Sequence, residues 1–343
     1  MFSCVLCYNF SMLNFCTLFD INFISQGLAM YESLKEHCRD DFTLYVFAFC
    51  RESYELLKEL NFDNLKVISL DELEQEFPKL PEVKKDRSKG EYCWTCSSLS
   101  ILYCIKKFTL KECTYLDSDI YFYSDPKALT DEMGDKSVLI TEHRFTPEYD
   151  QTEAGGKYCV QFMTFKNDEN GMKVLNWWAD RCIEWCYGRL EDGKFGDQKY
   201  LDDWLERFDG VHSLEHLGGG AAPWNIQQYS VKKRKQEIFI NNYPLVFYHF
   251  QNIKVNDDGE FSPTHYNFYR IALNVENIIY KPYLKKLSEI SKKLHEKNNK
   301  VKIIKNKFQK TDFKYWFKMQ RRKFFQIKLG REPYIILFGK KIV

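Results

Sequence analysis

Two aspartates in the segment YLDSDIYFYSDP, at residues 115–126, have the spacing of a metal site. Asp117 and Asp119 lie one residue apart, after an apolar pair and before the apolar run 120–123. On a regular strand their side chains would point to opposite faces, so both reach one ion only where the strand bends or ends. Burying two carboxylates without a cation is costly. The pattern therefore predicts a Mn²⁺ or Mg²⁺ site with positions open for phosphate oxygens. A solvated turn is the alternative.

A histidine in the last third of the chain could supply a further ligand. His249 lies in the short apolar run 246–250, and its neutral imidazole could bind a divalent cation. A lone histidine on an apolar strand is more often a core residue, but the acidic pair favours the ligand role. His216, which precedes a glycine-rich loop, is the rival candidate.

Two further segments carry residues that could contact a ligand. The loop 218–222 lets the backbone approach a ligand closely, since Gly219 and its glycine neighbours have no side chain. The loop lacks the phosphate-binding patterns of P-loop and dinucleotide-binding proteins, so those classes lose support. A plain connecting turn is the alternative. Asp197 and Gln198 open an expected helix, where Asp197 could cap the helix or face a ligand.

The elements that must position these residues alternate between strand-like and helix-like runs. We expect strands near 13–20, 42–49, 65–70, 113–123, 137–145, 158–166 and 244–250, and helices near 28–38, 52–60, 97–108, 171–191 and 197–208. Alternation at this spacing predicts βαβ units and an α/β fold with a largely parallel sheet. Asp117 and Asp119 then lie at the carboxyl end of a buried strand, where open parallel sheets bind ligands.

Charge divides the chain into an acidic body and a basic tail. Residues 291–343 hold 17 Lys/Arg against 3 Asp/Glu, although the net charge of all 343 residues is only +2. Aromatic and aliphatic residues are interleaved with the basic ones from residue 302 onwards, which favours contact with an anionic membrane surface. A basic helix packed on the acidic body is the alternative. No nucleic-acid-binding motif accompanies the tail, so no nucleic-acid partner is expected.

The twelve cysteines lack the regular spacing of a disulfide scaffold, so we expect reduced thiols in a cytoplasmic protein. Cys93 and Cys96 have zinc-ribbon or redox spacing, as do Cys4 and Cys7, but no second pair lies at ribbon distance from Cys93. No run reaches the roughly 18 to 20 apolar residues that span a bilayer. The start of the chain lacks the pattern of a cleaved signal, and we interpret residues 1–11 as an N-terminal extension.

Taken in order, the segments between residues 12 and 255 resemble glycosyltransferases of the GT-A fold, in particular bacterial enzymes of the glycogenin-like and lipooligosaccharide galactosyltransferase group. The resemblance is carried by LDSDIYFYSDP (116–126) as the DxD motif, GDQKYLDDW (196–204) as the DQ helix and FYHF (247–250) as the late metal-binding histidine. It implies a Rossmann-like, mixed and mostly parallel sheet flanked by helices.

The resemblance also implies roles for individual residues. It places Asp117, Asp119 and His249 on the metal, and Asp197 and Gln198 at the donor sugar as the catalytic residues. Around the nucleotide-sugar it places Thr17, Asp20, Thr95, Ser98, Asp117, Ser118, Gln161 and Gly219. Cys159 stands where the family commonly has an asparagine, and Gln161 could take over that contact. The glycine loop ends in Ala-Pro-Trp (222–224) where close relatives of glycogenin have Lys-Pro-Trp, so a lysine contact to the diphosphate is missing.

The implied function is metal-dependent sugar transfer from a nucleotide-diphosphate sugar, most simply a UDP-sugar. The implied acceptor is a glycan or lipid-linked glycan in surface polysaccharide or lipopolysaccharide synthesis, with retention of anomeric configuration. We expect a glycosyltransferase domain over 12–270 and a basic, helical extension over 271–343 that contacts the inner face of the membrane. A sugar-nucleotide hydrolase or nucleotidyltransferase, and a catalytically silent nucleotide-sugar-binding protein, are the alternatives.

Overall fold

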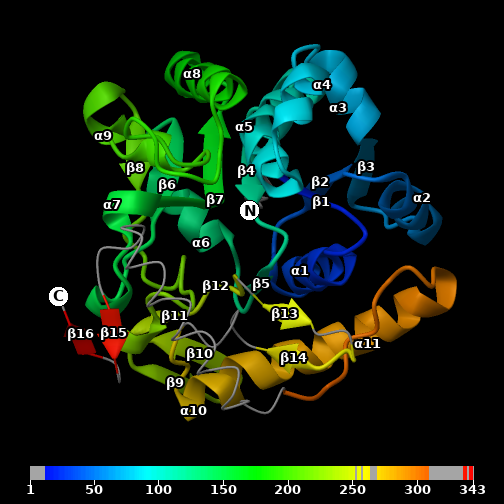
Figure 1. Ribbon diagram of the computed structural model, residues 1–343, viewed down its shortest axis with the longest axis vertical. Helices are drawn as coiled ribbons and strands as arrows, with labels where there is room; N and C mark the ends of the chain where they lie inside the picture. Colours follow the sequence, from blue (N-terminus) through cyan, green and yellow to red (C-terminus); the bar gives the residue numbers. More distant parts are fainter. Residues whose placement is uncertain are drawn as a thin grey trace, which may run out of the picture.

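A seven-stranded sheet runs through the centre of the molecule (Figure 1). The computed structural model describes residues 12–251, 253–255, 258–262, 269–308, 335–337 and 340–342. In chain order the strands of this sheet are β1 (Leu13–Phe19), β2 (Phe42–Ala48), β3 (Leu65–Ser69), β4 (Glu112–Leu116), β6 (Val138–Glu142), β7 (Tyr158–Lys166) and β8 (Val211–Ser213). Their order in space is β3-β2-β1-β4-β7-β6-β8.

The sheet is mixed and mostly parallel, which confirms the expected fold class. β1 pairs in parallel with both β2 and β4, and β2 pairs in parallel with β3. β7 runs antiparallel to its two neighbours, β4 and β6, and β8 pairs in parallel with β6. The chain order of the strands reverses at β1, so the carboxyl ends of β1 and β4 flank the kind of crevice in which open α/β sheets bind ligands.

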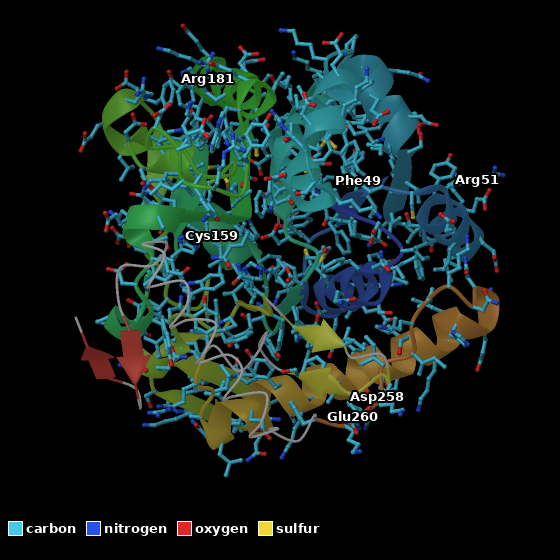
Figure 2. All side chains as sticks on the ribbon, viewed as in Figure 1. Phe49, Arg51, Cys159, Arg181, Asp258 and Glu260 are labelled. Atoms are coloured by element: carbon cyan, nitrogen blue, oxygen red, sulfur yellow. The ribbon has the colours of Figure 1, made fainter. Side chains whose placement is uncertain are left out.

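Helices cover both faces of the sheet, because alternate residues of the central strands are apolar on both sides. On β1, Phe15 and Phe19 belong to one hydrophobic core, and Cys16 and Leu18 belong to the other. The first core is completed by α1 (Ile24–His37), α2 (Arg51–Leu60) and α11 (Lys281–Lys297). The second is completed chiefly by α3 (Leu70–Glu76), α5 (Lys89–Phe108) and α8 (Glu169–Glu184). Side chains fill the space between these layers (Figure 2).

Short elements connect and flank this sheet. The short strands are β5 (Ile120–Phe122), β9 (Val231–Arg234), β10 (Glu237–Ile240), β11 (Tyr243–Pro244), β12 (Phe247–His249), β13 (Lys254–Val255), β14 (Phe261–Ser262), β15 (Ile335–Leu337) and β16 (Lys340–Ile342). The short helices include α4 (Leu80–Val83), α6 (Lys127–Thr130), α7 (Thr152–Gly155), α9 (Trp204–Arg207) and α10 (Leu273–Val275). In the part of the chain that the structure describes, no helix is both long and apolar enough to cross a membrane.

The basic helix α11 packs against α1 and contributes apolar side chains to the first core (Figure 1). Tyr283, Leu284 and Leu287 are fully buried, while Lys286 forms an ion pair with Glu32 of α1 at 2.5 Å. The described residues after α11, up to 308, form no helix, although Val301 and Ile304 are buried in the first core. The boundary at residue 270 stays a prediction.

Other expectations concern parts of the chain that the structure does not describe. The prediction of an N-terminal extension at 1–11 lies outside the described residues. So does most of the tail on which the membrane prediction depends, since residues 309–334 are not described. Both predictions therefore stay untested.

Several expected boundaries were wrong, and each difference has a local cause. The expected strand 113–123 is two strands, β4 and β5, separated by a turn at the aspartates. α5 begins at Lys89 rather than 97, because Ser88 and Glu91 form a capping box there. The expected helix 197–208 is only a 3₁₀ turn and the four-residue α9. Three aspartates lower the helix propensity of that segment.

Candidate metal centre and adjoining pocket

The aspartate pair lies in a tight turn at the end of β4, so the strand bends where both carboxylates must face one ion. The amide of Asp117 donates a hydrogen bond to the backbone oxygen of Gln161 on β7, at 3.0 Å. The amide of Ile120 then donates to the backbone oxygen of Asp117, at 3.3 Å, and β5 begins at that residue. The turn takes Asp119 out of the alternation that would otherwise point the two side chains apart.

Pairing between β5 and β12 brings His249 to the same turn. His249 is opposite Ile120 in this antiparallel pair, and the amide of Phe250 donates to the backbone oxygen of Asp119 at 2.9 Å. The Nε2 atom of His249 lies 3.0 Å from Oδ1 of Asp119 and 3.7 Å from Oδ2 of Asp117. One ligand atom from each of the three residues lies within 4.8 Å of the others. Residues separated by 130 positions in the sequence thus form one group.

The charges in this group shift the protonation of its members. Burial lowers the pKa of His249, but the charge of Asp119, a hydrogen bond to it and the charge of Asp117 raise it to well above its ordinary value. Burial raises the pKa of Asp117 to about 6, while the charge of His249 opposes that rise and the charge of Asp119 adds to it. A bound divalent cation would relieve the repulsion between the carboxylates, since it would be the largest local charge.

The three donors suit a divalent cation. Two carboxylate oxygens and one imidazole nitrogen form a donor set that Mn²⁺ accepts, and Mg²⁺ has a stronger preference for oxygen. The side chains of Asp117 and Asp119 are 29% and 19% exposed, so the site opens toward solvent on one side while His249 is buried behind it. A cation held here would keep coordination positions free for a ligand.

A cavity of about 460 Å³ adjoins the metal-binding group. Asp117, Asp119 and His249 form part of its wall. The remaining lining residues are Trp94, Ser97, His143, Phe145, Gln151, Ala154, Gly155, Cys159, Val160, Phe195, Gly196, Asp197, Gln198, Trp224, Gln251 and Tyr269. Figure 2 labels Cys159, on β7, near the centre of the molecule. The volume is within the range of sites that hold small organic ligands.

Asp197 and Gln198 line the same cavity as the metal-binding group. Asp197 is only 4% exposed, and the indole of Trp178 donates to its backbone oxygen at 2.9 Å, which fixes the chain at this point. Burial, and next the charge of Asp117, raise the pKa of Asp197 to about 8. Asp117 and Asp197 line the same cavity.

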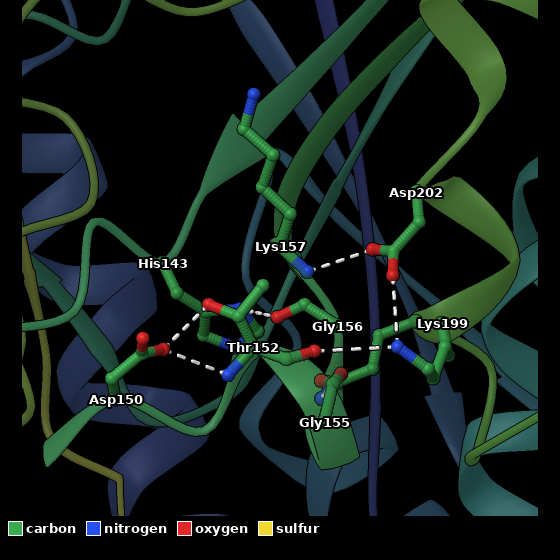
Figure 3. Close-up of polar contacts among 9 residues, drawn as sticks. His143, Asp150, Thr152, Gly155, Gly156, Lys157, Lys199 and Asp202 are labelled. Carbon is green, nitrogen blue, oxygen red and sulfur yellow. Dashed lines mark hydrogen bonds and ion pairs between the residues drawn. The ribbon is translucent and has the colours of Figure 1, made fainter. Parts of the chain in front are cut away.

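Another part of the cavity wall is formed by α7, and side chains from the segment 198–202 hold it in place. The amide of Gln198 donates to the backbone oxygen of Gly155 at 2.5 Å. Figure 3 shows the ammonium of Lys199 between the backbone oxygen of Thr152, at 3.2 Å, and the carboxylate of Asp202, at 3.0 Å. These contacts position α7 relative to Asp197.

Aromatic side chains form much of the rest of the wall, and the sequence analysis did not identify them as site residues. The rings of His143 and Phe145 stack with centroids 4.5 Å apart, and Trp224 lies edge-on to both His143 and His249. Trp94 is 37% exposed and faces Phe195. In the sequence, Trp94 stands between Cys93 and Cys96, and a large aromatic residue at that position could have indicated a site residue.

Several residues that the resemblance assigned to the nucleotide-sugar do not line this cavity. Thr17, Thr95, Ser98 and Gln161 are fully buried in the core. Asp20 follows β1 and accepts hydrogen bonds from the backbone and side-chain amides of Asn22. Ser118 is half-buried in the metal-binding turn. Their assignments to the ligand stay predictions.

The glycine-rich loop packs against protein atoms rather than bordering the cavity. A Cβ on Gly218 would lie 1.9 Å from the backbone oxygen of Pro244, and one on Gly219 would lie 2.6 Å from Leu214. Gly220, at a φ of +86°, would approach Thr141 to 2.8 Å. The loop instead accepts hydrogen bonds from the strand that carries His249, through the backbone oxygens of Gly218 and Ala221. The glycines are therefore needed for close packing behind the metal-binding group.

His216, the rival metal ligand, has a different role in the structure. Its Nδ1 atom accepts a hydrogen bond from the amide of Gly218 at 3.1 Å, and its ring packs edge-on against Tyr243. Among the described residues, the group of side chains at the aspartate turn that could hold a metal ion contains His249 and not His216.

Thr95 holds two helices together. Its hydroxyl donates to the backbone oxygen of Glu91 and accepts a hydrogen bond from Arg87, whose guanidinium also donates to the carbonyls of Cys182 and Ile183 at the end of α8. We expect Thr95→Val to lower the free energy of unfolding by about 1 to 2 kcal/mol, because Arg87 loses a buried partner. Urea unfolding measures this. The KM for a donor should not change; a raised KM at unchanged stability would instead support a nucleotide contact.

The ten described cysteines are all free, and three of them cluster in the second core. Cys16, Cys104 and Cys113 are fully buried, with sulfur atoms within 4.8 Å of one another, between β1, α5 and β4. Cys93 is half-buried and Cys96 is buried on α5. No disulfide joins any pair of described cysteines.

The fold and the site together agree with the class named by the sequence resemblance: a GT-A arrangement with a DxD turn and a late histidine at the switch point of a mixed sheet. No protein-family model matches the chain. The chain is 32% identical to the uncharacterised protein YfnD of Bacillus subtilis strain 168, over 282 residues that cover 80% of this chain and 88% of YfnD. It belongs to the same family as YfnD. YfnF of the same organism is 29% identical over 260 residues, covering 73% of this chain and 85% of YfnF.

The solved structures that match part of the chain include two glycosyltransferases. The glycosyltransferase GlyE of Streptococcus pneumoniae TIGR4 matches with a TM-score of 0.46 and 16% identity, over 87% of this chain and 66% of that one. The galactosyltransferase LgtC matches with a TM-score of 0.43 and 12% identity, over 70% of this chain and 87% of that one.

Proposed function

We propose that the protein is a metal-dependent glycosyltransferase that uses a nucleotide-diphosphate sugar, most simply a UDP-sugar, as its donor. The convergence of Asp117, Asp119 and His249 at the carboxyl end of β4 carries this proposal. The group lies at the switch point of the sheet and faces a cavity of about 460 Å³. Carboxylates that could hold a divalent cation, next to a cavity of this size, suit a small molecule that carries phosphate groups.

The side chains of the cavity have distinct parts in the proposed reaction. A divalent ion, Mn²⁺ in preference to Mg²⁺ because of the imidazole ligand, would neutralise the charge on the departing diphosphate. Asp197 and Gln198 would hold the hydroxyl groups of the donor sugar. The rings of Trp94 and Phe145 would cover apolar faces of bound sugars and exclude water, which favours transfer to an acceptor over hydrolysis.

We further propose that the reaction retains the anomeric configuration. The amide of Gln198 is already used in a hydrogen bond to the backbone of Gly155, and this arrangement suits an orienting group better than a nucleophile. The acceptor hydroxyl would then attack from the face that the diphosphate leaves. We propose a glycan or lipid-linked glycan of a surface polysaccharide as acceptor, with membrane contact through the part of the tail beyond residue 308.

A thermal-shift experiment tests the donor and the metal together. A ligand that binds the native state raises the melting temperature by mass action. At a free concentration of 100 times Kd, it adds about 2.7 kcal/mol to the free energy of unfolding. The panel contains nucleotide diphosphates and nucleotide-sugars with different bases. We expect only those with one particular base to raise the melting temperature, and only when Mn²⁺ is present and EDTA is absent. The absence of any shift with every nucleotide tested would contradict the proposal.

A further inference from the structure

Gln161 makes a buried contact with the metal-binding group from behind the cavity. Its Oε1 atom lies 2.8 Å from Nδ1 of His249, and both side chains are buried. The opposite ring nitrogen, Nε2, faces the two carboxylates. The two nitrogens of the ring therefore have different partners, and those partners decide which nitrogen carries a proton.

An amide oxygen can only accept a hydrogen bond, so Nδ1 of His249 must be the donor in this contact. A neutral imidazole that is protonated on Nδ1 has its lone pair on Nε2, the atom that points to the carboxylates. With the amide turned the other way, its NH₂ group would donate to Nδ1 and the proton would lie on Nε2. That arrangement would remove the lone pair from the metal-binding side.

The surroundings of Gln161 also fix its position. Gly220 has no side chain, and a Cβ there would lie 3.1 Å from Nε2 of Gln161. Within the described part of the chain, this Nε2 atom is buried without a hydrogen-bond partner. The oxygen that faces His249 is therefore the side-chain atom of Gln161 that makes a polar contact here.

We propose that Gln161 is a positioning residue that holds His249 in the Nδ1-protonated tautomer, with Nε2 free to bind the metal ion. This role differs from the contact to the donor sugar that the resemblance implied for Gln161, and it rests on the metal site of the proposed function. Ligating histidines commonly donate their second ring nitrogen to such a partner, and loss of the partner typically weakens metal affinity 10- to 100-fold.

Four proteins test the proposal by Mn²⁺ affinity, measured from the electron paramagnetic resonance signal of free Mn²⁺, with and without UDP. We expect Gln161→Leu, which removes the acceptor, to bind Mn²⁺ about 10- to 100-fold more weakly than wild type. Gln161→Glu retains an acceptor oxygen and should restore the affinity to near the wild-type value. Gln75→Leu, the same change on the exposed surface of α3, should leave it unaltered.

The ring nitrogens of His249 provide a readout that a general loss of packing would not reproduce. In ¹⁵N-histidine-labelled protein with Mg²⁺, we expect the His249 signals to show a proton on Nδ1 in wild type and Gln161→Glu, and a mixture of tautomers in Gln161→Leu. His249→Gln assigns the signals. Equal Mn²⁺ affinity in wild type and Gln161→Leu, with Nδ1 still protonated, would overturn the positioning role alone. A wild-type protein that binds no Mn²⁺ would overturn the metal site as well.

Discussion

Asp119→Asn is expected to reduce metal-dependent turnover of the donor by about 10³-fold or more. The substitution removes a charged ligand at a distance of 3.0 Å from the imidazole, while the backbone oxygen that accepts from Phe250 is unchanged. A metal ion contributes several kcal/mol of charge stabilisation in the transition state, and about 4 kcal/mol corresponds to a factor of 10³. The measurement is the rate of nucleoside-diphosphate release with Mn²⁺.

The control for this substitution is Asp135→Asn, at an exposed turn, which should keep the wild-type rate. Circular dichroism should show the same secondary structure for both variants. Mn²⁺ should also stop raising the melting temperature of Asp119→Asn in the presence of nucleotide. Full activity in a folded Asp119→Asn protein would show that the aspartate pair is not the metal site.

Gly218→Ala is expected to have the largest effect on stability among the glycine substitutions. The new Cβ would lie 1.9 Å from the backbone oxygen of Pro244, and a backbone atom cannot move away as the end of a side chain can. Overpacking in a core costs typically 1 to 3 kcal/mol and occasionally more, so we expect a loss of about 3 kcal/mol. Urea unfolding measures it.

Gly90→Ala is the matched control for that substitution. Gly90 lies in the first turn of α5 and has no atom within 4 Å of the position of a Cβ. Alanine is the better helix former, so this variant should be up to about 1 kcal/mol more stable than wild type. If Gly218→Ala were as stable as wild type but bound the donor poorly, the loop would border the ligand after all.

The sequence predicted the sheet and the aspartate pair at the end of a strand because both depend on local patterns. Apolar runs such as 13–20 and 42–49 specify buried strands, and an aspartate pair at the end of such a run is conspicuous. The prediction of a helix at 197–208 was wrong. The apolar residues there have helical spacing, but three aspartates in the same segment have low helix propensity. The capping box formed by Ser88 and Glu91 is a local pattern that marks the start of α5 in the sequence.

The environment of each site residue could not be predicted in the same way. Whether Gln161 faces the cavity or the core depends on the register of β7 beside β4. A shift of one residue in that register would move each side chain of β7 to the opposite face of the sheet. Thr95 is buried because α8 ends beside it, which no local pattern in α5 indicates. The contribution of Trp224 to the cavity depends on a loop that is far from Asp117 in the sequence.

The packing of α11 against α1 affects how the protein can fold as it leaves the ribosome. Synthesis proceeds from the N-terminus at about 5 to 20 residues per second, and the early part of a chain generally folds first. Here α1 is synthesised long before α11, the helix that covers it and supplies Tyr283 and Leu287 to the same core. A nascent chain that has not yet reached residue 281 therefore lacks the helix that covers the apolar surface of α1 in the folded protein.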